Sequence, residues 1–228
     1  MQIELRHISH YRQQWAGQQL LLDDINLTIA SGECVIISGR SGSGKSLLFS
    51  IVCGILAADS GDVLVDEKAI MTMTEVENQH YRRLLGVVFQ VSALLSNLSL
   101  AENLMLPLNQ HFPQRSQAQK TDEVEAIATA FGLSEFLNQR TDLLSTGQAA
   151  LGGFVRALLT RPKCLVWDAP LSEIDLHWAD LISAKLAEAK ATGTTVILFT
   201  NRQSVLDPLA DRRFCLEDGQ LKENSHAL

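Results

Sequence analysis

Eight consecutive residues near the start of the chain have the types and the spacing of a phosphate-binding loop. They read Gly39, Arg40, Ser41, Gly42, Ser43, Gly44, Lys45 and Ser46. The glycines allow a tight turn in which successive backbone N–H groups point at phosphate oxygens. In this arrangement the Lys45 side chain reaches the β- and γ-phosphates, and the Ser46 hydroxyl binds Mg²⁺. The loop therefore predicts a site for ATP or GTP with a magnesium ion.

The segments on either side of the loop supply the context that such a loop needs. Residues 34–38 form an apolar run that predicts a buried strand, and residues 47–56 predict a helix. The helix would present its positively polarised N-terminus to the phosphates. We therefore expect Leu47, the first residue after the loop, to contact the nucleotide as well.

Other stretches of the chain predict a sheet around this loop. Alternation of apolar and polar residues predicts half-buried antiparallel strands at 2–11 and 21–29, joined by a polar link at 12–19. Residues 61–65 and 86–89 predict two more strands. Continuous apolar runs, typical of parallel strands buried on both faces, follow at 164–168, 194–200 and 213–217.

Between these two groups of strands the pattern becomes helical. Residues 91–160 predict mostly helices, with breaks expected at Pro107, Pro113 and Gly132, and 176–190 predict one more helix. The fold class is therefore α/β: a P-loop NTPase core with a mainly parallel sheet, an N-terminal antiparallel β subdomain and an inserted helical subdomain.

The same pattern predicts how the domain is organised. The whole chain, 1–228, is expected to form one domain. Its core lobe would consist of 1–90 and 160–228, and 91–159 would form a helical lobe.

Composition and charge argue against some partners and locations. The formal net charge of −7 opposes the phosphate backbone, so we expect no nucleic-acid partner. No apolar run approaches the roughly 18 residues that span a bilayer. The four cysteines each stand alone in an apolar run, which favours reduced thiols in the core and a reducing, cytoplasmic compartment.

Four further motifs follow the loop in a defined order. Gln90 follows a predicted strand and Asp168 ends another, while 144–148 (Leu-Ser-Thr-Gly-Gln) and 172–175 (Ser-Glu-Ile-Asp) flank Asp168. Gln90 resembles the Q-loop glutamine, 144–148 the signature, Asp168 the Walker B aspartate and 172–175 the D-loop of the nucleotide-binding subunit of ABC transporters. The resemblance covers nearly the full chain. Residues 86–108 are similar to branches of that family that serve lipoprotein release, cell division and lipid trafficking.

The resemblance implies roles for the matched residues within one subunit. Lys45, Gln90 and Asp168 would act in ATP hydrolysis. Mg²⁺ would be bound by Ser46, Gln90 and Asp168.

The resemblance also implies partners. Each ATP would lie between the P-loop of one subunit and the signature of a second one, where Ser145 and the N–H group of Gly147 contact the γ-phosphate. An aromatic residue would stack on the adenine. The candidates are Trp15 and Tyr11, and Trp15 is favoured because it lies in the polar link. The pair, a homodimer or a heterodimer, would drive a separate integral-membrane permease, which would hold the chain at the cytoplasmic face of the cell membrane.

Three positions depart from the family pattern. Ala169 stands where the family has a glutamate that polarises the attacking water, and Asn201 stands where it has a histidine that contacts the γ-phosphate. Thr146 replaces a glycine of the signature, where a Cβ is expected to crowd the ligand or strain the backbone. A methyl group cannot accept a proton, so we expect ATP to bind and to be hydrolysed slowly. The alternatives are an active ATPase in which Glu173 replaces the missing base, and a soluble P-loop phosphotransferase.

Overall fold

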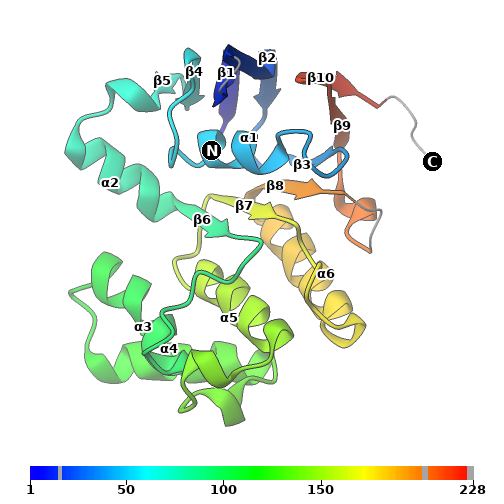
Figure 1. Ribbon diagram of the computed structural model, residues 1–228. Coiled ribbons are helices and arrows are strands. Elements are labelled where there is room, and N and C mark those ends of the chain that lie inside the picture. The colour runs from blue at the N-terminus through cyan, green and yellow to red at the C-terminus, as the bar shows by residue number, and fades with distance from the viewer. Residues whose placement is uncertain (15–16, 202–204, 225–228) are drawn as a thin grey trace.

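The chain folds as two sheets and a group of helices. The computed structural model describes residues 1–14, 17–201 and 205–224. Figure 1 shows a small sheet at the top, a second sheet across the middle with helix α1 between the two, and helices α3 to α5 below. Within the described residues, no helix combines the length and apolarity required to cross a membrane.

The upper sheet is the predicted N-terminal antiparallel subdomain. Its four strands are antiparallel and have the order β2-β1-β4-β5. They span Gly17–Ile29 (β2), Ile3–Gln14 (β1), Ser60–Val65 (β4) and Lys68–Ala69 (β5).

The polar link predicted at 12–19 is wrong, because the described part of this stretch extends the hairpin. Arg12 pairs with Gln19 and Gln14 pairs with Gly17. Both faces of the hairpin are exposed where they are described, so its strands need no apolar alternation there. The consequence for the site is that Arg12 belongs to a strand and not to a loop.

One glycine of β4, Gly61, packs against the backbone of β1. A Cβ at Gly61 would fall well inside van der Waals distance of the Arg6 and His7 carbonyl oxygens, and Gly61 has φ +83°. We expect Gly61→Ala to lower the free energy of unfolding in urea by about 3 kcal/mol. Gly132→Ala is the matched control, because Gly132 has φ +66° but no neighbour within 4 Å of its Cβ direction. This control should lower the free energy of unfolding by only about 1 kcal/mol. An equal decrease in both variants would contradict the steric explanation.

The central sheet is mainly parallel, as predicted. Its six strands have the order β10-β9-β3-β8-β7-β6, and only the β10–β9 pair is antiparallel. They span Gln220–Glu223 (β10), Arg212–Glu217 (β9), Cys34–Ser38 (β3), Thr195–Thr200 (β8), Cys164–Asp168 (β7) and Leu85–Val88 (β6). The loop of phosphate-binding type thus leaves the carboxyl end of a strand that lies inside the sheet.

Five further helices accompany α1, which spans Lys45–Val52. They are α2 (Glu75–Leu84), α3 (Leu100–His111), α4 (Gln117–Ala130), α5 (Thr146–Leu158) and α6 (Leu176–Ala191). Short 3-10 turns lie at Ile70–Thr72, Ser134–Phe136, Thr141–Leu143 and Asp207–Leu209.

Two predicted helix boundaries need correction. Helix α1 was expected at 47–56, but it starts at Lys45 and ends at Val52 because Gly44 (φ 98°) and Gly54 (φ +66°) take left-handed conformations at its two ends. The break expected at Pro107 does not occur, and Pro107 lies inside α3.

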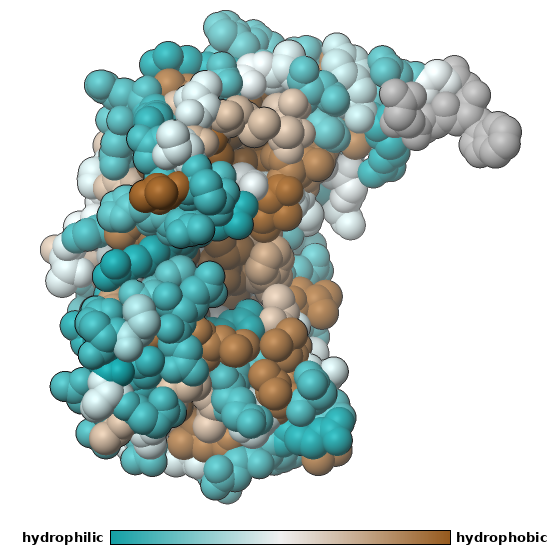
Figure 2. Space-filling model, turned by 90° about the vertical axis from the view of Figure 1, so that its left-hand side faces the viewer, coloured by the Kyte–Doolittle hydropathy of each residue, from teal (hydrophilic) through white to brown (hydrophobic). Residues whose placement is uncertain are grey.

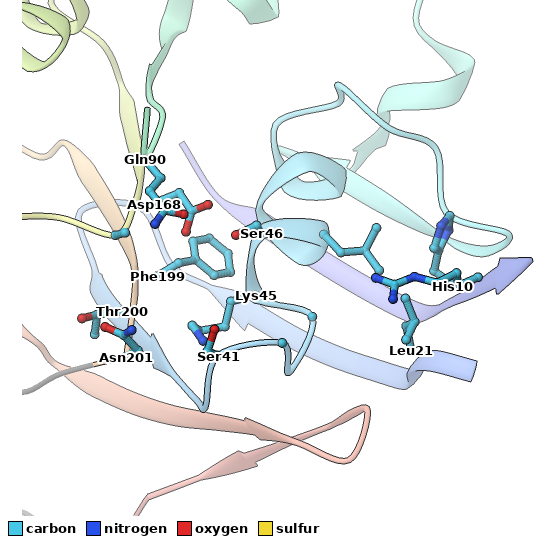
Figure 3. Close-up of a pocket in the computed structure, with 15 residues that line it drawn as sticks. His10, Leu21, Ser41, Lys45, Ser46, Gln90, Asp168, Phe199, Thr200 and Asn201 are labelled. Atoms are coloured by element: carbon cyan, nitrogen blue, oxygen red, sulfur yellow. The ribbon is translucent and has the colours of Figure 1, made fainter. Parts of the chain in front are cut away.

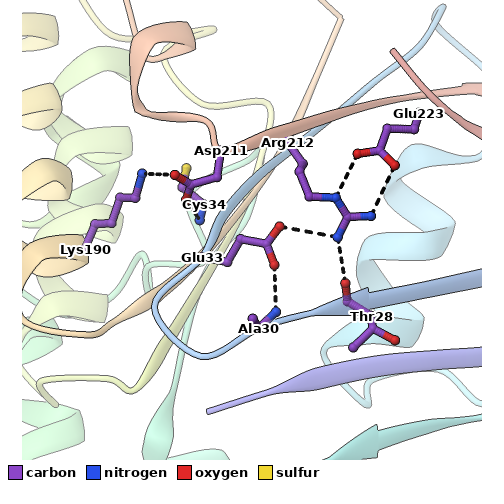
Figure 4. Close-up of polar contacts among 8 residues, drawn as sticks. All are labelled: Thr28, Ala30, Glu33, Cys34, Lys190, Asp211, Arg212 and Glu223. Atoms are coloured by element: carbon purple, nitrogen blue, oxygen red, sulfur yellow. Dashed lines mark hydrogen bonds and ion pairs between the residues drawn. The ribbon is translucent and has the colours of Figure 1, made fainter. Parts of the chain in front are cut away.

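Polar contacts of the Arg212 side chain join the β9–β10 hairpin to other strands. The Arg212 guanidinium group donates to both carboxylate oxygens of Glu223, at 2.8 and 3.3 Å, and to the Thr28 carbonyl oxygen at 3.0 Å. It also lies 3.4 Å from the Glu33 carboxylate, just before β3 (Figure 4). Arg212 therefore links β9 and β10 to β2 and to the start of β3.

Candidate functional site

The loop between β3 and α1 is closely packed on two sides and open on the third. A Cβ at Gly39 would lie 2.5 Å from the Leu216 carbonyl oxygen, and a Cβ at Gly44 would lie 3.2 Å from Cδ2 of Leu22. Gly42 (φ +82°) has nothing within 4 Å of its Cβ direction. The loop is therefore fixed by strands β9 and β2 and leaves space on its outer side.

The start of α1 fits an anion. Its N-cap residue is Gly44, so no side chain accepts a hydrogen bond from the first-turn N–H groups. The Lys45 ammonium group lies across the loop and donates to the carbonyl oxygens of Gly39 (2.7 Å) and Arg40 (2.8 Å). Burial lowers the pKa of Lys45, and the nearby Asp168 carboxylate opposes this shift. A phosphate group therefore suits both the backbone N–H groups and the ammonium group.

Gly44, Lys45 and Asp168 line a cavity of about 370 Å³ beside the carboxyl ends of β3, β7 and β8, whereas Gly39 and Arg40 do not line it. Figure 3 shows Lys45 and Ser46 in its middle, with Gln90, Asp168 and Asn201 toward one end. The four residues expected to bind Mg²⁺ or act in hydrolysis are thus brought together from three separate segments: the start of α1, the residues after β6 and the end of β7.

Other predicted contacts lie elsewhere. Ser145 and Gly147 are not among the residues that line the cavity, and neither is Tyr11. Trp15, the favoured candidate for stacking on adenine, lies outside the described residues.

Asp168 at the end of β7 provides the carboxylate of the site. Its side chain is nearly buried, with 5% of the residue exposed. Burial raises the pKa of this carboxyl group, while a hydrogen bond with Ser46 and the charge of Lys45 act in the opposite direction. A carboxylate and a hydroxyl side by side are oxygen ligands of the kind that Mg²⁺ prefers, so the residues present fit this ion.

The raised pKa of Asp168 predicts that the ionised carboxylate destabilises the fold in the absence of ligand. An acid whose pKa is higher in the folded state holds its proton more tightly there, so ionisation lowers the free energy of unfolding as pH rises through that pKa. We expect Asp168→Asn to have a higher Tm than the wild type near neutral pH and to bind Mg²⁺ with ATP more weakly.

Differential scanning calorimetry across the acidic range tests this sign. The gain in Tm should shrink as the pH falls below the pKa of the carboxyl group, where Asp168 is itself neutral. Asp122→Asn, an exposed change on α4, should leave Tm unchanged and serves as the control. A variant that is less stable than the wild type at every pH would refute the prediction.

Two of the three departures from the family pattern lie in the same cavity. Ala169 and Asn201 both line it, and neither side chain can accept a proton at ordinary pH. The Ala169 N–H donates to the Phe199 carbonyl oxygen at 2.8 Å, and its backbone is left-handed with φ +52°. Glu173, the candidate replacement base, is exposed and is not among the lining residues.

The residues of the signature form the start of α5. Ser145 is the N-cap: its Oγ accepts from the Gln148 N–H at 3.2 Å, and Oε1 of Gln148 accepts from the Ser145 N–H at 2.8 Å. Thr146 is the first helical residue and is not among the residues with positive φ, so the strain expected there is absent. A Cβ at Gly147 would lie 3.0 Å from the Glu173 carbonyl oxygen, which explains a glycine at this position.

Sequence reasoning missed one end of the cavity. His10 and Arg12 of β1 and Leu21 of β2 line it opposite Asp168 and Gln90. The signal that could have found these residues is the alternation of His10 and Arg12 on one strand, had the strand been extended beyond Tyr11.

Comparisons with known proteins agree with this geometry. The sequence profile of the ABC transporter family matches residues 22–172. The methionine import ATP-binding protein MetN of Rhizobium johnstonii is 34% identical over 208 residues, which are 91% of this chain and 57% of that protein. The MetN protein of Clostridioides difficile is 29% identical over 97% of this chain and 67% of its own length. The chain thus spans just over half the length of the first of these relatives.

Solved structures give the same result. A dimeric, post-hydrolysis state of the ATP-binding cassette MJ0796 bound to ADP and Pi has a TM-score of 0.90 and 26% identity, with 97% of each chain covered. A nucleotide-free ATP-binding cassette from an ABC transporter has a TM-score of 0.77 and 26% identity, over 98% of this chain and 91% of that one. The predicted family and fold class are therefore confirmed, and this chain is an ATP-binding domain of the ABC transporter family.

Proposed function

We propose that this chain is the ATP-binding subunit of a membrane transporter and that its own site hydrolyses ATP slowly. The observation that carries the proposal is a cavity in which the phosphate-binding parts are complete while a methyl group occupies the position of the expected base. Lys45, Ser46 and Asp168 line this cavity together with Ala169.

Binding and chemistry depend on different residues of the site. The first-turn N–H groups of α1 and the Lys45 ammonium group would bind the β- and γ-phosphates. Ser46 and Asp168 would hold Mg²⁺, which neutralises negative charge on the phosphates. Gln90 would orient the attacking water, but no side chain in the position of Ala169 takes its proton. A missing general base typically lowers a rate by about 10²–10⁴-fold, so the loss falls on turnover and not on affinity.

A second nucleotide-binding subunit is part of the proposal. Ser145 is exposed and lies outside the cavity of its own chain, so a γ-phosphate that it contacts would belong to ATP held by another subunit. The MJ0796 cassette is described as dimeric, which supports such a pairing. The partner can be a second copy or a different chain that carries the missing base.

A separate permease would attach the pair to the cytoplasmic face of the membrane. Figure 2 shows apolar side chains along a hollow on the side of the molecule that carries α2 and β6. Val76 on α2, and Phe89, Val91 and Leu95 after β6, are exposed large apolar residues. Exposed apolar side chains that gather on one surface are typical of a site where another protein binds. Relatives named for methionine import favour import as the direction of transport.

The test is to measure ATP affinity and steady-state ATP hydrolysis of the purified chain, alone and in its native membrane complex. We expect saturable binding of ATP with little turnover by the chain alone. Turnover in the complex would then come from a second ATPase subunit. Robust turnover by the isolated chain that disappears in Lys45→Ala would refute slow hydrolysis, and Glu173 would be the first residue to examine as a replacement base.

A further inference from the structure

Three phenylalanine rings form a row that runs from the surface after β6 to the wall of the cavity. The Phe49 ring of α1 meets the Phe89 ring edge to face, with ring centroids 5.5 Å apart and an angle of 77° between the planes. On its other side the Phe49 ring meets the Phe199 ring of β8 at 5.9 Å and 88°. We call these three residues the aromatic row.

The inner end of the aromatic row is part of the cavity wall. Phe199 is fully buried, lines the cavity and pairs with Asp168 on the neighbouring strand β7. Its carbonyl oxygen accepts from the Ala169 N–H at 2.8 Å. Figure 3 shows its ring pointing toward the start of α1, where Ser46 lies. A shift of Phe199 would therefore move the wall at the position of the missing base.

The middle of the aromatic row is enclosed by other side chains. Phe49 is 2% exposed, and it lies one helical turn after Lys45 on α1. Edge-to-face aromatic pairs have a preferred geometry, and a close-packed interior transmits a displacement instead of absorbing it. A displacement of the Phe49 ring would thus reach both the start of α1 and the ring of Phe199.

The outer end of the aromatic row is accessible to a partner protein. Phe89 is 37% exposed, and Val91, two residues further along the chain, is 80% exposed. Gln90 lies between them and lines the cavity. A protein that covers this short apolar segment would therefore contact the outer ring of the row directly.

We propose that Phe49 is a positioning residue that couples contacts made at Phe89 on the surface to the cavity wall at Phe199. This inference rests on the proposed function as an ATP-binding subunit and concerns how a partner would regulate that site. The coupling runs through the packing of the rings and does not require the side chain of Gln90. Because coupling between two sites is reciprocal, ATP bound in the cavity should also change the surroundings of Phe89.

Fluorine NMR of the full chain, with para-fluorophenylalanine in place of Phe89, tests the proposal. Addition of saturating ATP with Mg²⁺ should shift the resonance of this probe. Phe49→Leu and Phe199→Leu each remove one ring and keep an apolar side chain, so both should abolish the shift. Gln90→Ala leaves the aromatic row complete and should keep the shift. The same probe in place of Phe136, in a 3-10 turn after α4, is the control and should not respond.

Calorimetric titration of each chain with ATP separates the possible outcomes. A wild-type chain that binds ATP without a shift at position 89 would overturn the coupling, whether or not the leucine variants fold. A shift that survives in Phe49→Leu and is lost in Gln90→Ala would assign the coupling to the glutamine side chain and refute the proposal. A shift that survives in Phe199→Leu would also refute it, because the coupling would not reach the cavity wall through that ring. A wild-type chain that does not bind ATP would refute the proposed function itself, whereas the preceding results would leave it intact.

Discussion

Ala169→Glu is expected to raise the steady-state rate of ATP hydrolysis by about 100-fold, because it returns a proton acceptor to the cavity. The backbone at this position is already left-handed, with φ +52°, and alanine bears that strain as glutamate would. The Ala169 N–H is held by the Phe199 carbonyl oxygen at 2.8 Å, so the new side chain would start from a fixed point on the cavity wall. A phosphate-release assay on the purified variant measures the effect.

The control for this experiment is Ala169→Gln, which has the same shape and no basic carboxylate. It should hydrolyse ATP no faster than the wild type. Adding Asn201→His to Ala169→Glu should increase the rate further, because an imidazole then faces the γ-phosphate end of the cavity. If glutamate and glutamine give the same rate, the absence of a base at 169 does not limit turnover and the explanation of slow hydrolysis is wrong.

Lys45→Ala is expected to weaken ATP binding by about 100-fold, which corresponds to about 3 kcal/mol. The Lys45 ammonium group lies inside the loop, where it donates to the carbonyl oxygens of Gly39 and Arg40. Its removal eliminates the cation that faces the phosphates and also two hydrogen bonds that hold the loop closed. Titration calorimetry with ATP and tripolyphosphate should show the loss for both ligands.

Lys163→Ala is the matched control, since it removes the same charge from an exposed position just before β7, at the opposite end of that strand from Asp168. It should bind ATP as the wild type does. Circular dichroism would verify that both variants remain folded. Equal losses in the two variants would mean that net charge, and not the position of Lys45 in the loop, governs affinity.

Local patterns were sufficient for much of the fold. Strands β3 and β7 have the predicted bounds because each is a continuous apolar run buried on both faces. Pro107 shows where local reasoning failed. Helix α3 tolerates it because Ser99 and Glu102 form a capping box and Leu104 and Leu108 are fully buried on one face. Tertiary packing there outweighs the usual penalty of roughly 3 kcal/mol for an interior proline.

The candidate site also contains some residues that the sequence predicts and others that it does not. Lys45, Ser46, Gln90 and Asp168 could be predicted because each belongs to a motif with a defined place relative to a strand or helix, and all four line the cavity. Arg12 could not, because its part of the hairpin is exposed on both faces and carries no periodic apolar signal. Its place in the cavity follows from pairing with β2, which is a contact between strands.

The position of β9 in the central sheet has a consequence for protein synthesis. Strand β3, which leads into the phosphate-binding loop, pairs on one side with β9, and the loop packs at Gly39 against the carbonyl oxygen of Leu216. The ribosome therefore synthesises the loop early, whereas strand β9, which supports the loop, is complete only after residue 217 has been added. Until then the nascent chain exposes an unpaired edge of β3 and has no finished nucleotide site. ATP can stabilise this domain only after translation of β9, so chaperones that shield the earlier strands would act before any nucleotide does.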